Sequence, residues 1–169
     1  GRRQMCIRDS NSALLCDILL ENSTVADIGS GAGLPGIPVA IARPDLEVFL
    51  IEPLLRRVTF LNEAVEKLGL ENVTVIRGRA EEKTVQQKVG KVDFITSRAV
   101  APLAKLAKWS GPFADKGSYL VALKGSSAAE EIERDANAVG IAGWRNEEVV
   151  QLHRDGGVDD TYVIRAIHI

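Results

Sequence analysis

The sequence is poor in cysteine and in aromatic residues: Cys6 and Cys16 are its two cysteines, and aromatics make up 5% of its 169 residues. Because neither cysteine has a partner at metal-ligand spacing, we expect no disulfide framework and no metal site. No apolar run approaches the ~20 residues of a membrane-spanning helix, and no secretory signal segment is present. We therefore expect a cytoplasmic protein that makes no membrane contact.

The chain also lacks an excess of charge of one sign. It carries 21 Lys and Arg against 23 Asp and Glu, a formal net charge of −2, whereas nucleic-acid-binding domains are usually basic. The charge is unevenly spread, because residues 52–124 hold 13 basic and 8 acidic residues while residues 125–169 hold 4 and 9. This distribution permits a nucleic acid to approach one face of the molecule despite the acidic total.

The chain length and composition predict one globular domain. Hydrophobic residues are 46% and charged residues 26% of the chain, which is ordinary for a domain of this size. Residues 1–10 show no periodic pattern and do not begin with Met, whereas a helical pattern starts at Asn11 with Leu14, Leu15, Ile18 and Leu19 on one face. We expect residues 1–10 to be a truncated or foreign segment and residues 11–169 to form the domain.

Short apolar strands alternate with amphipathic helices along the rest of the chain. We expect strands at 25–28, 46–51, 73–76, 92–96 and 119–123, with helices at 34–42, 54–68, 80–88, 102–114 and 127–139. Two last strands, 149–152 and 162–168, have no helix between them and form a closing hairpin. Such alternation predicts an α/β fold with a mostly parallel, doubly wound sheet, to which the hairpin adds one antiparallel strand.

A glycine-rich turn joins the first strand to the first helix. Residues 27–36 read DIGSGAGLPG, in which Gly31, Gly33 and Gly36 match the G-x-G-x-x-G pattern of dinucleotide sites. Closely spaced glycines at this junction leave bare backbone, which a bound ligand can approach. The turn therefore predicts a cofactor site, and a purely structural turn is the alternative.

The charge beside the turn favours one class of cofactor. Asp27 ends the strand two residues before Gly29, and a carboxylate there would repel the pyrophosphate of a dinucleotide. S-adenosylmethionine carries a sulfonium and an ammonium instead, so the same carboxylate would attract it. Pro35 also removes one N–H from the helix start, which weakens a phosphate cradle. The turn is thus predicted to bind the methyl donor, with a nicotinamide dinucleotide as the alternative.

Further candidates for the cofactor site follow the second and third strands. Glu52 is placed to accept hydrogen bonds from both ribose hydroxyls, and the Ala80 backbone to read the adenine edge. Glu81 or Glu82 could receive the adenine amine, although an acidic pair is also favoured at a helix start by the helix dipole. All lie at the carboxyl ends of parallel strands, where open sheets bind ligands.

The fourth strand bears on the methyl acceptor. It is followed by Ser-Arg-Ala-Val at 97–100, without the Asn/Asp-Pro-Pro-aromatic motif common in methyltransferases of exocyclic amines. No cysteine lies near the site, and His153 and His168 fall in the closing hairpin, so no general base is evident. Guanine N7 needs none, because its lone pair is free at neutral pH and requires only alignment. Arg98 and Lys124 are candidates to orient the donor, base or phosphate.

Five segments follow one another in a recognisable order: DIGSGAGLPGIP at 27–38, EPLLRRVTFL at 52–61, RGRAEE at 77–82, SRA at 97–99 and LKG at 123–125. Together they resemble the bacterial small-subunit (16S) rRNA guanine-N7 methyltransferases, also called glucose-inhibited division protein B, in their actinobacterial form. The resemblance covers residues 11–169. Members of the family carry a further helical N-terminal segment that is missing here.

The resemblance implies a class I, Rossmann-like methyltransferase fold that uses S-adenosylmethionine. It also implies a guanine N7 acceptor in 16S rRNA of the small ribosomal subunit. Together with the motifs, it gives a set of donor-site candidates: Asp27, Gly29, Gly31, Gly33, Leu34, Glu52, Ala80, Glu81 and Arg98.

Basic side chains in residues 52–124 are candidate RNA phosphate contacts: Arg56, Arg57, Lys105, Lys108 and Lys124. We expect a monomer without a metal. Two alternatives stay open: an NAD(P)-dependent reductase, and a module that binds the donor or RNA without turnover.

Overall fold

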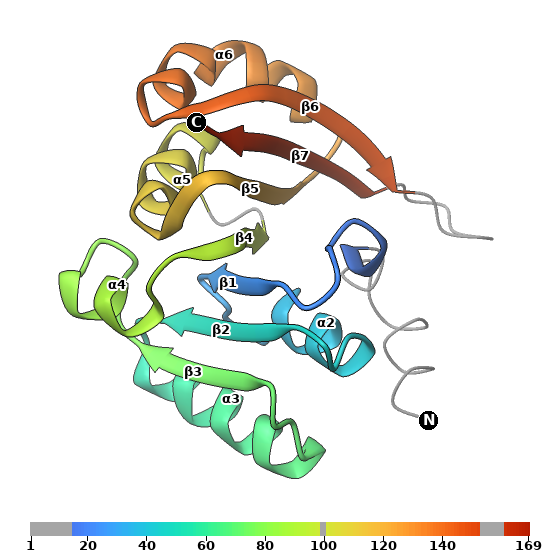
Figure 1. Cartoon of the computed structure of the whole chain (residues 1–169), viewed down its shortest axis with the longest axis vertical. Helices are drawn as coiled ribbons and strands as arrows, with labels where there is room; N and C mark the ends of the chain where they lie inside the picture. Colours follow the sequence, from blue (N-terminus) through green and yellow to red (C-terminus); the bar gives the residue numbers. More distant parts are fainter. Residues whose placement is uncertain (1–14, 99–100, 153–160) are drawn as a thin grey trace.

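Seven strands form one sheet in the computed structural model, which describes residues 15–98, 101–152 and 161–169 (Figure 1). The strand order is β3-β2-β1-β4-β5-β7-β6. Strands β1 to β5 are parallel, and β7 runs antiparallel to both β5 and β6. The expected α/β fold with one antiparallel strand is confirmed. The strands are β1 Thr24–Ile28, β2 Glu47–Glu52, β3 Val73–Arg77, β4 Val92–Arg98, β5 Ala114–Lys124, β6 Trp144–Leu152 and β7 Thr161–His168.

Helices cover both faces of this sheet. They are α2 Gly36–Ala42, α3 Leu55–Leu68, α4 Lys83–Val89, α5 Leu103–Ser110 and α6 Ala128–Ile141, with a 3-10 turn η2 at Gly111–Phe113. Side chains alternate across a strand, so Val48 and Leu50 of β2 join one hydrophobic cluster and Ile51 joins the other. Helices α2 and α3 pack into the cluster that contains Val48, and helices α4, α5 and α6 pack into the cluster that contains Ile51.

Several element boundaries differ from those expected. Helix α2 starts at Gly36 rather than residue 34, because the preceding turn is closed by the Gly33 N–H donating to the Ser30 carbonyl at 2.7 Å. The helix expected over 102–114 divides into α5 and η2, and β5 begins at Ala114. The helix expected from residue 11 is described from Leu15, where a single 3-10 turn is found. Residues 1–14, 99–100 and 153–160, with His153, lie outside the described residues.

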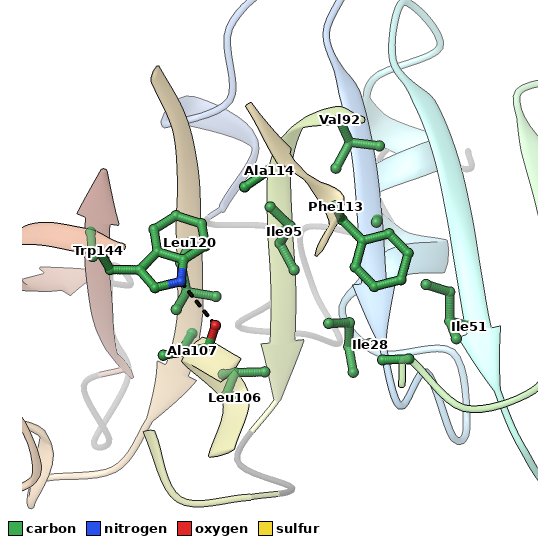
Figure 2. Packing of buried hydrophobic residues seen from close by; sticks show 14 of the residues in the cluster. Ile28, Ile51, Val92, Ile95, Leu106, Ala107, Phe113, Ala114, Leu120 and Trp144 are labelled. Carbon is green, nitrogen blue, oxygen red and sulfur yellow. Dashed lines mark hydrogen bonds between the residues drawn. The ribbon is translucent and has the colours of Figure 1, made fainter. Parts of the chain in front are cut away.

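Trp144 joins the last strands to α5 in the larger cluster (Figure 2). Its indole is fully buried, and Nε1 donates to the Ala107 carbonyl at 3.0 Å. That carbonyl also accepts the Gly111 N–H at the end of α5. The apolar ring therefore packs β6 against α5, while the indole nitrogen satisfies its hydrogen-bonding capacity on the helix backbone.

Trp144→Phe is expected to lower the free energy of unfolding by about 1 kcal/mol, through one lost hydrogen bond and reduced ring volume. The loss stays modest because the Ala107 carbonyl keeps the Gly111 N–H. Urea unfolding measures it. Trp109→Phe, a change on the same helix at a partly buried position, serves as the control and is expected to cost less. An equal cost for both variants would contradict the assigned hydrogen bond.

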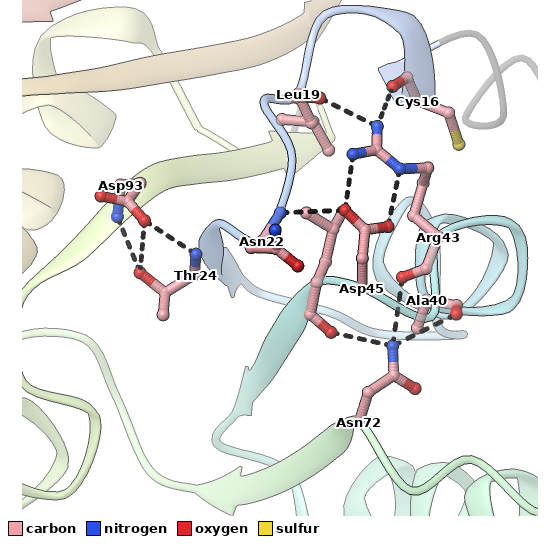
Figure 3. A network of polar contacts seen from close by, with 10 residues as sticks. Cys16, Leu19, Asn22, Thr24, Ala40, Arg43, Asp45, Asn72 and Asp93 are labelled. Carbon is pink, nitrogen blue, oxygen red and sulfur yellow. Dashed lines mark hydrogen bonds and ion pairs between the residues drawn. The ribbon is translucent and has the colours of Figure 1, made fainter.

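At the amino edge of the sheet, Arg43 holds the segment before β1 (Figure 3). Its Nη1 donates to the carbonyls of Cys16 and Leu19, at 2.6 and 2.8 Å. Its Nε and Nη2 bind both Asp45 oxygens at 2.9 and 2.8 Å, and this pairing holds the pKa of Asp45 well below its usual range. These contacts tie the segment before β1 to the residues before β2, at the opposite edge of the sheet from the glycine turn.

Candidate functional site

The glycine turn lies where β1 and β2 end. Gly29, Gly31 and Gly33 have φ values of +70°, +52° and +94°, a region that side-chain-bearing residues rarely adopt. The N–H groups of Gly29 and Ser30 both donate to the Ile51 carbonyl, at 2.9 and 3.1 Å. The turn is therefore tied to the end of β2, which brings it beside Glu52.

Two glycines of the motif have different surroundings. A Cβ on Gly36 would overlap Leu50 Cδ2 and lie 2.9 Å from Asp27 Oδ2. A Cβ on Gly31 would meet nothing closer than the Gly29 carbonyl oxygen at 3.7 Å and Arg57 Nη1 at 3.8 Å. Gly36 thus permits α2 to pack on the sheet, whereas Gly31 leaves space open above the turn.

A cavity of about 220 Å³ adjoins the turn at the carboxyl edge of the sheet. Four of the predicted cofactor residues, Gly29, Glu52, Ala80 and Glu81, line it. Its volume is below the roughly 300–1,000 Å³ of typical small-molecule pockets, so it suits part of a ligand, such as a nucleoside. Leu34 and Arg98 lie outside its wall, as do Gly31 and Gly33.

Leu54, Pro53 and Trp109 are among the wall residues that were not expected from the sequence. Leu54 was grouped with the apolar stripe of the helix at 54–68, yet it precedes α3, is 51% exposed and lines the cavity. Pro53 and the partly buried Trp109 of α5 also line it. Their apolar character did not mark them as cavity residues. Trp109, for example, falls in a helical pattern that fits a core residue equally well.

Glu52 provides the buried carboxylate of this cavity. It ends β2 and is 2% exposed. Arg57 Nη1 lies 3.3 Å from its Oε1. A carboxylate in this position can accept hydrogen bonds from ligand hydroxyls.

The connection from β3 to α4 forms the adjacent wall. The Gly78 N–H donates to the Glu52 carbonyl at 3.0 Å, and Gln86 Nε2 donates to the Ala80 carbonyl at 3.0 Å. Glu82 Oε1 accepts the Arg79 N–H at 2.9 Å. Glu82 therefore serves the loop itself, and Glu81, which is exposed and faces the cavity, is the acidic side chain available to a ligand.

Asp27 lies behind the turn and not in the cavity wall. It is fully buried, its Oδ1 accepts a hydrogen bond from Thr96 Oγ1 at 2.9 Å, and its Oδ2 has no hydrogen-bond partner among the described residues. Burial raises the pKa of Asp27 to about 7, against the lowering effect of the Thr96 hydrogen bond. We expected the Asp27 carboxylate to attract a cationic ligand directly, but its side chain is buried and lies outside the cavity wall.

The predicted cations separate into two groups. Lys124 was expected at the exposed rim, but its side chain is 7% exposed and Nζ donates to the Ala101 carbonyl and Glu131 Oε1, at 2.8 and 2.9 Å. Glu131 Oε1 also accepts the Leu103 N–H at 2.7 Å. Lys124 therefore joins β5 to the start of α5 and to α6, and is not an open phosphate contact. The other predicted cations are exposed: Arg56, Arg57, Arg98, Lys105 and Lys108.

Within the described ranges, no helix is long and apolar enough to cross a membrane. No group of three or more His, Cys, Asp or Glu side chains there could hold a metal ion.

Comparison with protein families and relatives gives a consistent result. The family model GidB, described as rRNA small subunit methyltransferase G, matches residues 7–160. A ribosomal RNA small subunit methyltransferase G from Corynebacterium efficiens is 61% identical over 133 residues, which are 79% of this chain and 57% of that protein. Its counterpart from Corynebacterium glutamicum strain R is 62% identical over 139 residues, 82% of this chain and 62% of that protein. The chain thus spans less than two thirds of the length of these relatives.

Solved structures show the same architecture. A SAM-dependent methyltransferase from Aquifex aeolicus has a TM-score of 0.69 at 21% identity, covering 100% of this chain and 94% of that one. Aeropyrum pernix fibrillarin, solved with natively bound S-adenosyl-L-methionine, has a TM-score of 0.70 at 18% identity and covers 96% and 76%. At these identities the likeness establishes the fold, which is that of class I methyltransferases.

Proposed function

Because the chain belongs to the GidB family of rRNA small subunit methyltransferases, we propose that it transfers a methyl group from S-adenosylmethionine to N7 of a guanine in 16S ribosomal RNA. One observation carries the proposal. A nucleoside-sized cavity with a buried carboxylate, Glu52, adjoins a glycine turn whose Gly31 leaves open space. Because the proposed substrate is ribosomal RNA, we also propose that the protein is cytoplasmic and acts as a monomer.

The residues at this edge fit the donor part by part. Glu52 would accept hydrogen bonds from the two ribose hydroxyls, and the Ala80 backbone with Glu81 would hold the adenine against Trp109 and Leu54. Gly29, Gly31, Gly33 and Leu34 would hold the amino-acid part of the donor. The bound donor supplies a methyl group activated on a positively charged sulfur.

The proposed methyl acceptor, guanine N7, requires alignment with the methyl group rather than removal of a proton. Among the residues that the structure describes, none that line the cavity is a histidine or a cysteine. Guanine N7 offers a lone pair without losing a proton first, so the protein has only to hold the base in line with the methyl group. Arg98, exposed at the end of β4, would orient the guanine or a phosphate.

Exposed cations outside the cavity would contact the RNA backbone. Arg56 at the start of α3 and Lys105 and Lys108 on α5 are exposed and suited to phosphate oxygens. Lys124 is omitted from this set because it is paired with Glu131.

The nicotinamide alternative receives no support from α2. A dinucleotide places its pyrophosphate on the N-terminus of this helix, but Gly36, Ile37 and Pro38 in its first turn are buried. Pro35, which precedes them, carries no N–H. The start of α2 thus offers little open backbone to a phosphate.

Two measurements on the purified chain test the proposal. Calorimetry is expected to show binding of S-adenosylhomocysteine and no binding of NAD. Incubation with S-adenosylmethionine and 30S subunits that lack the modification is expected to yield 7-methylguanine, mapped in 16S rRNA by mass spectrometry. Binding of NAD alone would support a reductase, and donor binding without methyl incorporation would support a non-catalytic module.

A further inference from the structure

In the described ranges, Arg57 is the cation that pairs with the buried carboxylate of the proposed donor site. It lies in the first turn of α3, where its N–H donates to the Leu54 carbonyl at 3.0 Å. Its side chain is 54% exposed, while that of Glu52 is 3% exposed. One partner of this pair is therefore held inside the cavity wall and the other reaches in from the rim.

The same guanidinium nitrogen lies between Glu52 and the glycine turn. Arg57 Nη1 is 3.3 Å from Glu52 Oε1 and 3.8 Å from where a Cβ on Gly31 would be. No other hydrogen bond to the Glu52 side chain occurs in the part of the chain that the structure describes. Among the described residues, Arg57 is thus the only polar restraint on this carboxylate.

The ion pair with Arg57 does not use the full hydrogen-bonding capacity of the Glu52 carboxylate. Charge-assisted N–H···O hydrogen bonds are commonly about 2.7–2.9 Å, and the Arg57–Glu52 distance of 3.3 Å is longer. A carboxylate can accept about four hydrogen bonds, so Glu52 retains capacity for ligand hydroxyls while Arg57 contacts one oxygen. A buried carboxylate that loses its one cation is costly to keep in place.

We propose that Arg57 is a positioning residue of the donor site, which holds the Glu52 carboxylate where it accepts the two ribose hydroxyls. This role rests on the proposed function and replaces the RNA phosphate contact that the sequence suggested for Arg57. It predicts that Arg57 acts on donor affinity through the ribose diol and has little effect on RNA affinity.

Calorimetry with S-adenosylhomocysteine and its 2′-deoxy analogue tests this role. Arg57→Met is expected to weaken S-adenosylhomocysteine binding about tenfold, the effect of losing one charge-assisted contact. Arg57→Lys, which keeps the charge, is expected to restore most of the affinity. The wild type should prefer the diol ligand over the 2′-deoxy analogue, and Arg57→Met should largely lose that preference.

Arg56→Met is the matched control, because Arg56 is the exposed neighbour and forms no ion pair within the described residues. It should leave affinity for both ligands unchanged. RNA affinity, measured on the same variants with a 16S rRNA fragment, should fall for Arg56→Met and stay near wild type for Arg57→Met. Urea unfolding of each variant confirms that the comparison is made on folded protein.

Three outcomes would overturn the inference while leaving the proposed function intact. These are unchanged S-adenosylhomocysteine binding by Arg57→Met, an equal loss for the diol and 2′-deoxy ligands, and a loss of RNA affinity alone. Failure of the wild type itself to bind S-adenosylhomocysteine would instead contradict the proposed function. The two failures are therefore distinguishable in one set of titrations.

Discussion

Asp27→Asn is expected to be more stable than the wild type at pH 8 and about equally stable at pH 4. Burial raises the pKa of Asp27 from 3.8 to about 7 in the folded state. The folded wild type therefore binds a proton that the unfolded chain has released between these values, and its stability falls as the pH rises from about 4 to 7. Asn carries no charge, so this fall is absent in the variant.

The size of the effect follows from the shift in pKa. Each unit corresponds to about 1.4 kcal/mol, so a shift of about three units sets an upper limit of about 4 kcal/mol on the gain at pH 8. The Asn side-chain carbonyl can still accept the hydrogen bond from Thr96 Oγ1 that now reaches Asp27 Oδ1. Part of the gain is lost where the amide nitrogen finds no acceptor.

Urea unfolding of both proteins from pH 4 to pH 8 measures this difference. Comparison of the two proteins cancels the opposite contribution of groups such as Asp45, whose lowered pKa makes stability fall toward acid pH. Thr96→Val is a second probe: it removes a hydrogen bond that favours the ionised carboxyl, so its cost should be larger at pH 8 than at pH 4. Parallel stability curves for Asp27→Asn and wild type would contradict the buried, uncompensated state of Asp27.

Gly36→Ala is expected to lower the free energy of unfolding by about 2–3 kcal/mol, a typical cost of overpacking. The new Cβ would overlap Leu50 Cδ2 and come within 2.9 Å of Asp27 Oδ2, so α2 must move away from β1 and β2. The substitution is therefore expected to lower the stability of the fold and not the affinity for the ligand. Urea unfolding measures it, and S-adenosylhomocysteine binding under folded conditions should be weakened far less than in a variant that blocks the open space.

Gly31→Ala is the matched comparison, because it adds the same methyl group to the same turn. Its Cβ meets nothing closer than 3.7 Å, so the cost to stability is the backbone strain at φ +52°, about 1 kcal/mol. Donor binding should fall at least tenfold, since the methyl group occupies the space proposed for the ligand. If Gly31→Ala binds S-adenosylhomocysteine as tightly as wild type, the assignment of that space is wrong.

Local signals in the sequence predicted the order of elements correctly, but not all of their ends. Strand-length apolar runs and helix-length apolar stripes alternate, and both patterns depend on residues close together in the chain. The ends depended on contacts between distant residues. The turn before α2 is tied to Ile51 of β2 in addition to being closed by its own Gly33–Ser30 hydrogen bond, and β5 begins early because Ala114 pairs with Val92 of β4.

The residues of the candidate site were likewise only partly predictable from the sequence. Gly29, Glu52, Ala80 and Glu81 could be grouped from the sequence, since residues at the carboxyl ends of parallel strands share one edge of the sheet. The sequence could not distinguish Glu81 from its neighbour Glu82, whose carboxylate accepts the Arg79 N–H. Nor could it reveal that Trp109, far along the chain, completes the wall.

The sequence by itself determined the α/β order, the glycine turn and the family. Each depends on a periodicity or a motif within a short segment, which can be recognised without knowing how the rest of the chain folds. Only the tertiary structure decided which charges are open to solvent. Asp27 is buried beside Thr96, and Lys124 is paired with Glu131. Arg57 is drawn to Glu52, a pairing set by where α3 begins after β2. Burial and ion pairing depend on elements that meet only when the sheet and its helices assemble.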